Sequence, residues 1–410
     1  MSAGLTLSSR LKGVLESSTL KMNALARELA AKGKKVINLT AGEPDFPVLE
    51  PVKDEAIAAI RADFSKYTQV SGIPELRKGI SAKFKRDNGL EYAQDAVLVS
   101  CGAKQSIFNF LLAAVSPGDE VIILAPYWVS YPEMVKLAGG VPVILDAPQS
   151  AGFKITPVQL QKALTRKTKV LVLNSPSNPT GAVYTREEQA ALARVLEEAA
   201  RSGGPGVWVV SDEIYEKLVY GVEFASFASL SEDAFRRTLT VNGFSKAYAM
   251  TGWRLGYAAG PRDLIAAMTL VQGQSTSGAA SIVQKAAVKA LEIPDNELAP
   301  MVEAFRRRRD RMSEIFSRCN KCSFVEPQGA FYLFLNVERF AGRTYNKDGK
   351  PEVLRGSEDL AFYLLDRSQV VTVAGAGFGA DGYLRISFAM SDADVEEGAN
   401  RIVKALDSLG

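Results

Sequence analysis

Seven short apolar segments alternate with stretches of helical periodicity between about residues 50 and 290, and this alternation constrains the fold more than any other sequence feature. The segments span residues 96–100, 121–124, 141–145, 170–173, 207–211, 238–241 and 255–259. Several are apolar throughout, as expected for strands that are buried on both faces. The alternation predicts an α/β fold with a mostly parallel seven-stranded sheet wrapped by helices.

One of the intervening helices has clear start and stop signals. Pro74 suits a first-turn position, because proline lacks a backbone N–H that would be left unpaired there. Leu76, Ile80 and Phe84 recur at helical spacing and predict one buried face. Gly89 is expected to end this helix, because glycine tolerates the left-handed conformation common at helix ends.

The chain changes in character after about residue 292. Its 410 residues are too many for a single compact core. A long charged helix over residues 296–316 precedes short strand-like segments and a final helix. We therefore expect three parts, namely residues 1–48 as an N-terminal arm and part of a small domain, residues 49–292 as a large domain, and residues 293–410 as a small α+β domain.

Composition excludes several classes of chemistry. The chain contains no histidine, which excludes Ser-His-Asp and Cys-His catalysis and histidine-ligated metals. Cys319 and Cys322 form a C-x-x-C pair, but zinc needs about four ligands, so we expect no metal. A net charge of +3, spread along the chain, gives no sign of nucleic-acid binding. The sequence has no membrane-spanning run and no signal peptide, so we expect no membrane partner and a cytoplasmic location.

Four loops follow predicted strands, at the sheet edge where open α/β proteins bind ligands. The first contains Gly102, Ala103 and Lys104 at a helix start, where backbone N–H groups can bind a phosphate. A plain tight turn is the alternative for this loop. The second loop, residues 174–181, is a rigid turn in which the Asn178 amide can donate to a ligand oxygen.

The third and fourth loops carry ionisable side chains. Asp212 and Tyr215 follow a buried strand, where a carboxylate is costly unless it is paired. A protonated pyridine nitrogen would be such a partner, and a helix N-cap is the alternative. Lys246 lies in an apolar and aromatic stretch, where an amine can lose its proton and act as a nucleophile. Ser245 and Arg254 beside it are good phosphate donors.

The combination of these motifs resembles the fold-type I pyridoxal-phosphate (PLP) enzymes, specifically the class I aminotransferases. The motifs are Asn178-Pro-Thr-Gly181, Asp212-Glu-Ile-Tyr215 and Ser245-Lys-Ala-Tyr-Ala-Met-Thr-Gly-Trp-Arg-Leu-Gly256. The resemblance runs from Gly42 to Arg385, nearly the whole chain. It implies PLP as the cofactor and residues 49–292 as the domain that binds it.

The resemblance also implies roles for individual residues. Lys246 should form the Schiff base with PLP and later shuttle a proton. Asp212 should pair with the pyridine nitrogen, so that the ring can act as an electron sink. Asn178 and Tyr215 should hydrogen-bond the phenolic oxygen of PLP. Trp128 should stack on the ring, with core packing as its alternative.

The resemblance likewise implies where the phosphate and the substrate bind. The phosphate is expected to bind the backbone of Gly102, Ala103 and Lys104, and the side chains of Ser245 and Arg254. Tyr67 is expected to reach this phosphate from a partner subunit, which implies a homodimer with shared active sites. Arg385 should hold the substrate α-carboxylate through a bidentate fork, and the Gly42 backbone, Trp128 and Asn178 should also contact the substrate.

Two positions depart from the family pattern. Many relatives have serine where this chain has Gly243, so one phosphate donor is absent. Some relatives have histidine where this chain has Tyr131, so the side chain that supports Asp212 should differ.

Lys104 bears on the choice of substrate. The prokaryotic-type aspartate aminotransferases, which the chain resembles most, carry a lysine there that is proposed to bind the distal carboxylate. Ser17, Ser18 and Thr19 resemble N-terminal residues that assist it. We therefore expect ping-pong conversion of aspartate and 2-oxoglutarate to oxaloacetate and glutamate. A solvated helix lysine is the alternative for Lys104.

Other functions on the same fold stay open from the sequence. The enzyme can be an aminotransferase for prephenate or for another amino acid instead of aspartate and 2-oxoglutarate. A PLP-dependent lyase would carry the same Lys246 and Asp212. A non-enzymatic regulator that reuses this fold is disfavoured, because the chain has no spare length for a DNA-binding domain.

Overall fold

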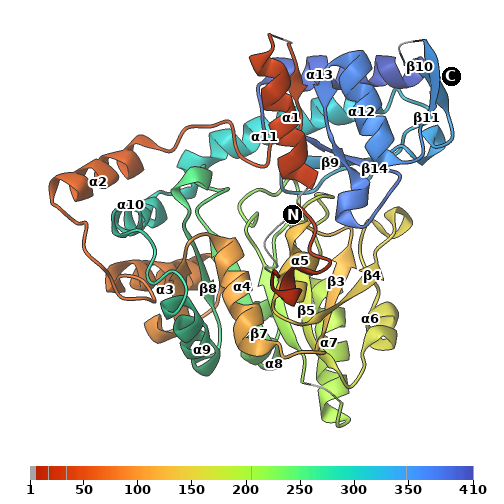
Figure 1. The fold of residues 1–410 in the computed structure, drawn as a ribbon. Helices are drawn as coiled ribbons and strands as arrows, with labels where there is room; N and C mark the ends of the chain where they lie inside the picture. Colours follow the sequence, from red (N-terminus) through yellow and green to blue (C-terminus); the bar gives the residue numbers. More distant parts are fainter. Residues whose placement is uncertain (1–5, 17, 34, 205, 348, 410) are drawn as a thin grey trace.

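A computed structural model describes residues 6–16, 18–33, 35–204, 206–347 and 349–409 (Figure 1). Its largest sheet has seven strands in the order β2-β8-β7-β6-β5-β3-β4. The strands are β2 (Val97–Ser100), β3 (Glu120–Ala125), β4 (Val141–Asp146), β5 (Thr168–Asn174), β6 (Trp208–Asp212), β7 (Thr238–Gly243) and β8 (Gly256–Ala259). Only β8 runs antiparallel to its neighbours β2 and β7, which confirms the predicted mostly parallel sheet.

Helices cover both faces of this sheet, because successive residues of each buried strand point to opposite sides. In β5, Val170 and Val172 pack against one group of helices, whereas Leu171 and Leu173 pack against the other. The first group is α4 (Ala103–Ala114), α5 (Ser130–Leu137) and α9 (Arg262–Gly273). The second group is α6 (Pro157–Ala163), α7 (Arg186–Arg201) and α8 (Glu232–Arg237). Further along the sheet, α3 (Pro74–Asn88) contacts β2, and α10 (Ser281–Glu292) and α2 (Glu50–Arg61) pack outside it in the same core.

The signals predicted for α3 are confirmed. Pro74 is its first residue, and Leu76, Ile80 and Phe84 are fully buried. Gly89 follows its last residue with a φ of 67°, in the left-handed region. By contrast, β4 is apolar but exposed along much of its length, because it forms the edge of the sheet.

A second group of elements forms its own core beside the large sheet. Strands β9 (Tyr332–Asn336), β13 (Val373–Ala374) and β14 (Tyr383–Ser387) make an antiparallel sheet in the order β13-β14-β9. Two strand pairs, β1 (Ile37–Asn38) with β12 (Val370–Val371) and β10 (Thr344–Lys347) with β11 (Lys350–Val353), lie apart from it. The helices are α1 (Ser18–Ala31), α11 (Asp295–Phe316), α12 (Ser357–Ser368) and α13 (Asp392–Asp407). In Figure 1 these elements sit above the large sheet.

Register brings polar groups together at the carboxyl end of the large sheet. Asn174 at the end of β5 lies beside Asp212 at the end of β6, and the Asn174 amide donates to the Asp212 carbonyl at 3.0 Å. Parallel strands end at the same edge, so the loops that follow them converge there. Within the described ranges, no helix has both the length and the apolar character needed to cross a membrane.

Candidate active site

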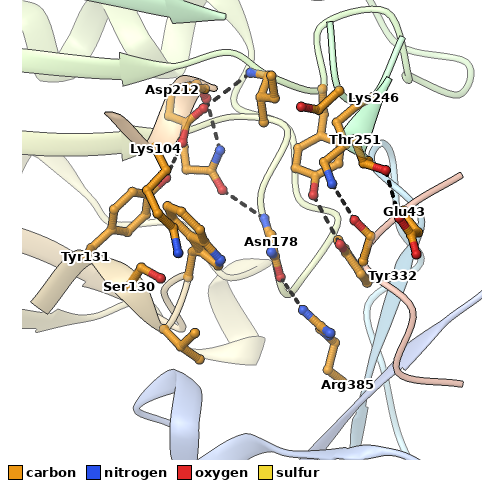
Figure 2. A pocket seen from close by; sticks show the side chains of 18 of the residues that line it. Glu43, Lys104, Ser130, Tyr131, Asn178, Asp212, Lys246, Thr251, Tyr332 and Arg385 are labelled. Carbon is orange, nitrogen blue, oxygen red and sulfur yellow. Dashed lines mark hydrogen bonds between the residues drawn. The ribbon is translucent and has the colours of Figure 1, made fainter. Parts of the chain in front are cut away.

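A cavity of about 450 Å³ opens where these loops meet the second group of elements (Figure 2). This volume lies in the range of sites for small molecules. Apart from the N-terminal residues 17–19, every residue predicted for the site lines this cavity except Gly102 and Tyr67. Gly102 is packed against the Arg254 side chain, which lines the cavity in its place. Tyr67 is fully exposed elsewhere on the chain.

Asp212 is a buried carboxyl group whose hydrogen-bond donors are all neutral. Its side chain is nearly inaccessible, at 4% exposure. The Tyr131 hydroxyl donates to one carboxylate oxygen at 2.6 Å, and the Ile214 backbone N–H donates to the other at 3.3 Å. Burial raises the pKa of Asp212 to about 6. A cationic ligand atom beside Asp212 would stabilise the ionised form, so this wall of the cavity suits a protonated ring nitrogen.

Tyr131 is the residue that stands where some relatives have a histidine. Its hydroxyl contact shows how Asp212 is supported in this chain. A phenol donates one hydrogen bond and remains neutral, because burial and the neighbouring Asp212 charge raise the pKa of Tyr131. Asp212 therefore has a neutral hydrogen-bond donor at this position instead of a titrating imidazole.

Lys246 projects into the same cavity as a buried amine (Figure 2). Its Nζ donates to the Gly42 carbonyl and lies 5.7 Å from the centroid of the Tyr215 ring. Burial, followed by the charge of Arg385, lowers the pKa of Lys246 to about 8. A useful fraction of this amine is therefore unprotonated near neutral pH, as a nucleophile requires.

The start of α4 packs so closely against β8 and the loop before it that two glycines are required there. Gly102 has a φ of 87°, and a Cβ atom on it would lie 2.6 Å from Nη2 of Arg254. A Cβ on Gly256 would lie 2.2 Å from the backbone nitrogen of Ala103. This close approach brings Ser245 and Arg254 beside the unpaired N–H groups of the first turn of α4. Such a cradle fits a phosphate group.

Gly243 belongs to the same close contact. A Cβ at this position would lie 3.0 Å from the Gly256 Cα and 3.2 Å from the Ile214 side chain. The serine that many relatives carry there would crowd the Gly256 backbone and the Ile214 side chain, so glycine fits the close packing at this position.

Arg385 is a buried cation that contacts neutral oxygens. Its guanidinium donates to Oδ1 of Asn178 at 3.1 Å and to the Thr40 carbonyl at 2.9 Å. Its Cζ lies 4.4 Å from the Tyr332 ring centroid, and its Nε has no hydrogen-bond partner within the described part of the chain. The side chain is 2% exposed. A buried guanidinium is costly without an anion, so this wall of the cavity suits a carboxylate ligand.

Lys104 approaches the cavity from a different wall. Its Nζ lies 4.8 Å from the centroid of the Trp128 ring, a cation–π contact between two residues that line the cavity. Burial, and next the charge of Arg254, lowers the pKa of Lys104. In Figure 2 Lys104 and Arg385 extend from separate elements, α4 and β14, so the cavity offers two cationic contacts to one ligand.

Some lining residues were not predicted from the sequence. Glu43 accepts a hydrogen bond from Thr251 at 2.7 Å, and Tyr332 contacts the Tyr215 hydroxyl at 3.1 Å. Arg27 on α1 also lines the cavity. Glu43 directly follows Gly42, a predicted substrate contact, so its position could have been found from the sequence. Tyr332 lies in an apolar strand and Arg27 on α1, where nothing in the local sequence marks them.

The N-terminal residues proposed to assist Lys104 are not placed by the structure. Ser17 lies outside the described residues, and so do the side chains of Ser18 and Thr19.

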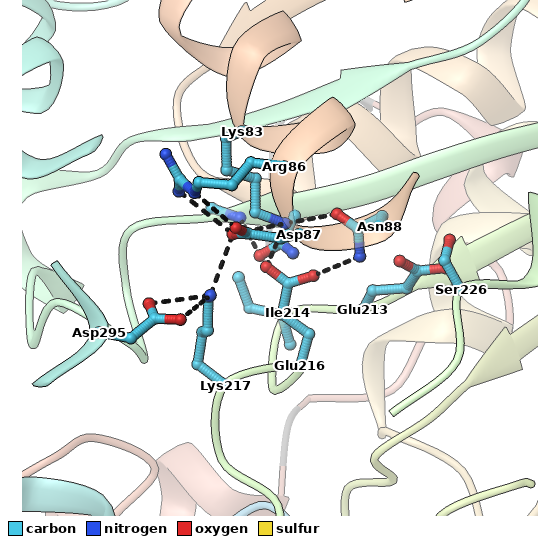
Figure 3. A network of polar contacts seen from close by, with 12 residues as sticks. Lys83, Arg86, Asp87, Asn88, Glu213, Ile214, Glu216, Lys217, Ser226 and Asp295 are labelled. Atoms are coloured by element: carbon cyan, nitrogen blue, oxygen red, sulfur yellow. Dashed lines mark hydrogen bonds and ion pairs between the residues drawn. The ribbon is translucent and has the colours of Figure 1, made fainter. Parts of the chain in front are cut away.

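A second carboxyl group, Glu213, is buried next to Asp212 in the chain but does not line the cavity (Figure 3). One of its oxygens accepts hydrogen bonds from the Ser211 and Ser226 hydroxyls, at 2.8 and 2.7 Å. The other has no hydrogen-bond partner within the described residues. Burial, and next the charge of Glu216, raises the pKa of Glu213 to about 8.

Glu213 should make stability depend on pH. Because its pKa is higher in the folded chain than in the unfolded chain, its contribution is complete below the unfolded pKa of about 4.3 and is lost as pH rises through about 8. Glu213→Gln removes this titration. Between pH 5 and 8.5 the free energy of unfolding of the parent should fall by about 3–5 kcal/mol relative to the variant, measured by urea denaturation. Parallel pH profiles for the two proteins would contradict this assignment.

Together, the buried amine, the buried carboxyl group at the strand end and the anion cradle define a PLP-dependent enzyme on an α/β sheet. The chain matches the family described as aminotransferase class I and II over residues 34–402, and it belongs to that family. It is thus an aminotransferase-type enzyme with PLP as its cofactor.

Named proteins and solved structures that are similar to this chain are also aminotransferases. The chain is 48% identical to an aspartate/prephenate aminotransferase of Cereibacter sphaeroides, over 97% of both chains. It is also 48% identical to a bifunctional aspartate aminotransferase and glutamate/aspartate-prephenate aminotransferase of Petunia hybrida, over 99% of this chain and 84% of that protein. Two similar structures are the aspartate aminotransferases of Rhizobium meliloti (TM-score 0.92, 43% identity, 98% and 99% coverage) and of Thermus thermophilus with maleate (0.90, 41%, 98% and 100%).

Proposed function

We propose that this enzyme transfers the amino group of aspartate to 2-oxoglutarate by a ping-pong mechanism. Aspartate is converted to oxaloacetate in the first half-reaction, and 2-oxoglutarate is converted to glutamate in the second, at the same cofactor. The observation that carries the proposal is the buried Arg385, a cation with neutral partners that faces the cavity. Lys104 adds a second cation on another wall, which suits a substrate with two carboxylates. The names of the similar proteins, which include aspartate aminotransferases, support the same substrate class.

The residues of the cavity fit PLP. The first turn of α4 with Ser245 and Arg254 would hold its phosphate, Asp212 its ring nitrogen, and Asn178 and Tyr215 its phenolic oxygen. Trp128 would stack on one face of the PLP ring, and the Lys246 amine would bond to the aldehyde carbon of PLP as a Schiff base. When bound, PLP supplies an electron sink that takes up the electron pair released at the substrate Cα.

The protein's own groups then have three tasks. Arg385 and the Gly42 backbone orient the α-carboxylate, and Lys104 binds the distal one. The Lys246 amine, whose pKa is lowered to about 8, takes the proton from the substrate Cα and returns it elsewhere on the reacting molecule. Asp212 remains ionised beside a cationic ring nitrogen, because an adjacent positive charge offsets the burial that raises its pKa.

A direct assay tests this function. Purified protein with PLP, aspartate and 2-oxoglutarate should form oxaloacetate and glutamate in equal amounts. A spectrum of the purified protein should show a yellow chromophore whose band shifts on adding aspartate. Release of pyruvate and ammonia from a cysteine-like substrate, without glutamate formation, would instead assign a lyase.

Prephenate is a second candidate acceptor. It is favoured by the printed names of similar proteins, several of which are aspartate/prephenate aminotransferases. Prephenate also carries two carboxylates, which Arg385 and Lys104 could bind. The same assay with prephenate in place of 2-oxoglutarate separates the two: oxaloacetate should form at a comparable rate only if prephenate is a true acceptor.

Removing the Lys104 charge should reduce selectivity for dicarboxylic acids. Lys104→Met keeps the length and the contact with Trp128 but cannot bind a carboxylate. A hydrogen bond to a charged group contributes about 1.5–3 kcal/mol, so KM for aspartate should rise by roughly ten- to a hundredfold. Alanine, which lacks a distal carboxylate, should keep its KM within about twofold in steady-state assays. Equal loss for both substrates would refute the role.

We further propose the domain division given above, a homodimer and a cytoplasmic location. Pairing of β1 with β12 supports assigning the segment before residue 49 partly to the C-terminal domain. Full exposure of Tyr67 supports its reaching the phosphate of a partner's site. Analytical ultracentrifugation of the intact enzyme tests the dimer.

A further inference from the structure

A buried polar network lies behind the turn that carries Tyr215, outside the cavity (Figure 3). The turn spans residues 213–218. The Glu216 N–H donates to the Glu213 carbonyl at 2.9 Å, and the Leu218 N–H donates to the Tyr215 carbonyl at 2.8 Å. Tyr215 faces the cavity from this turn, and Glu216 faces α3. Because the two residues are consecutive in one turn, contacts that fix the Glu216 side chain also restrain the backbone that carries Tyr215.

Lys83 anchors the Glu216 side chain to the last turns of α3. Its Nζ forms an ion pair with one carboxylate oxygen of Glu216 and donates to Oδ1 of Asn88 at 2.8 Å. The Asn88 amide in turn donates to the other Glu216 oxygen at 3.0 Å. Three side chains thus close a ring of contacts that fixes both carboxylate oxygens. Lys83 and Glu216 are only 2% and 7% exposed.

Lys217 ties the same turn to two helices. Its Nζ lies 3.0 Å from Oδ2 of Asp87 on α3 and 2.9 Å from Oδ1 of Asp295 in the first turn of α11. Oδ1 of Asp87 also forms an ion pair with Nε of Arg86, at 2.7 Å. The turn is therefore fixed through two consecutive side chains, both directed away from the cavity.

Stability alone is a poor explanation for this arrangement. Burying a lysine and a glutamate costs several kcal/mol of desolvation each, and apolar side chains of similar volume often serve as well or better. What a buried ion pair adds is a defined geometry. We propose that Lys83 and Glu216 are positioning residues that hold Tyr215 at the angle required for its hydrogen bond to the cofactor. This inference rests on the proposed role of Tyr215.

The test separates position from stability with a paired replacement. Lys83→Met with Glu216→Leu removes both charges together and leaves no buried ion unpaired, so its thermal midpoint should remain within about 5 °C of the parent. The pKa of the bound chromophore, read from its absorbance spectrum without substrate, should rise by about one unit as the Tyr215 hydrogen bond weakens. The affinity for PLP should fall by roughly tenfold, and kcat for aspartate should fall more than KM rises, because Arg385 and Lys104 lie elsewhere.

An exposed ion pair between α3 and the segment that follows it provides the matched control. Lys85 and Glu91 form an ion pair at 2.7 Å in which both side chains are largely exposed. Lys85→Met with Glu91→Leu should leave the chromophore pKa, PLP affinity and kcat unchanged. If the buried double variant does not accumulate as folded protein, Glu216→Gln provides the same readouts, since its amide can still contact Asn88 while losing the ion pair.

The outcomes distinguish this inference from the proposed function. A parent protein that forms no chromophore overturns the role of Tyr215 and the proposed function with it. A parent that is active, with a double variant whose chromophore pKa and PLP affinity match the parent, overturns the positioning role only. A variant that loses stability without a shift in chromophore pKa also overturns it, since it assigns Lys83 to folding.

Discussion

Replacing Lys246 with alanine should abolish transamination and remove the yellow chromophore. The side chain provides both the amine that holds the cofactor and the group that moves the proton at the substrate Cα. Proton transfer by a positioned side chain contributes about 10²–10⁴-fold on its own, so loss of both tasks should reduce kcat by roughly 10⁴-fold or more. Single-turnover measurements with aspartate and absorbance spectra would report both effects.

Two further variants make this expectation specific. Lys246→Arg keeps a positive charge but holds its proton, so it should be nearly as inactive as alanine. A small primary amine added to Lys246→Ala should recover part of the proton-transfer rate, because it can enter a cavity of about 450 Å³. Retention of more than about 1% of parental kcat by Lys246→Ala would contradict the role proposed for this lysine.

Replacing Arg385 with leucine should have the second-largest effect on catalysis, with a different signature. The proposed contact with the substrate α-carboxylate is bidentate and buried, and loss of one partner of such a pair costs about 3–5 kcal/mol. That corresponds to a fall in kcat/KM of roughly 10²–10⁴-fold for every amino-acid substrate. Arg385→Lys should recover part of this loss, since a point charge remains without the fork.

Stability provides the control for this variant. In the ligand-free chain Arg385 is a buried cation with neutral hydrogen-bond partners, so leucine should leave the thermal midpoint unchanged or raise it. Improved or equal stability with greatly reduced activity is the pattern of a residue retained for its ligand. Lower stability with unchanged kcat/KM would assign Arg385 to the core instead.

Much of the fold follows from local sequence patterns. All seven strands of the large sheet were recognised because buried strands are short, apolar and separated by helices of different periodicity. The direction of β8 was not recognised, since an apolar run has the same composition whichever way it crosses the sheet. The exposure of β4 was not predicted either, although Val141 is 47% and Ile144 43% exposed. Position at the sheet edge depends on the order of the strands and not on their composition.

Predicted site residues that lie at or just after strand ends also line the cavity. Asp212 ends β6 and Lys246 follows the end of β7, so the sequence pattern that marks these strands also indicated where the two side chains lie. Contacts between distant elements could not be predicted in the same way. The Tyr131 hydroxyl reaches Asp212 across 81 residues, and Lys83 reaches Glu216 from a helix whose sequence looks ordinary. Such pairs depend on how the helices dock on the sheet.

The hydrogen bond from Arg385 to the Thr40 carbonyl joins two segments that lie 345 residues apart. Such a contact can form only after Arg385 has been synthesised and has left the ribosome, whereas the large sheet and Lys246 are made earlier and domains generally fold as units during synthesis. A growing chain would therefore carry the cofactor lysine for some time while still lacking the group that binds the substrate carboxylate, so catalysis should begin only once Arg385 has reached Thr40.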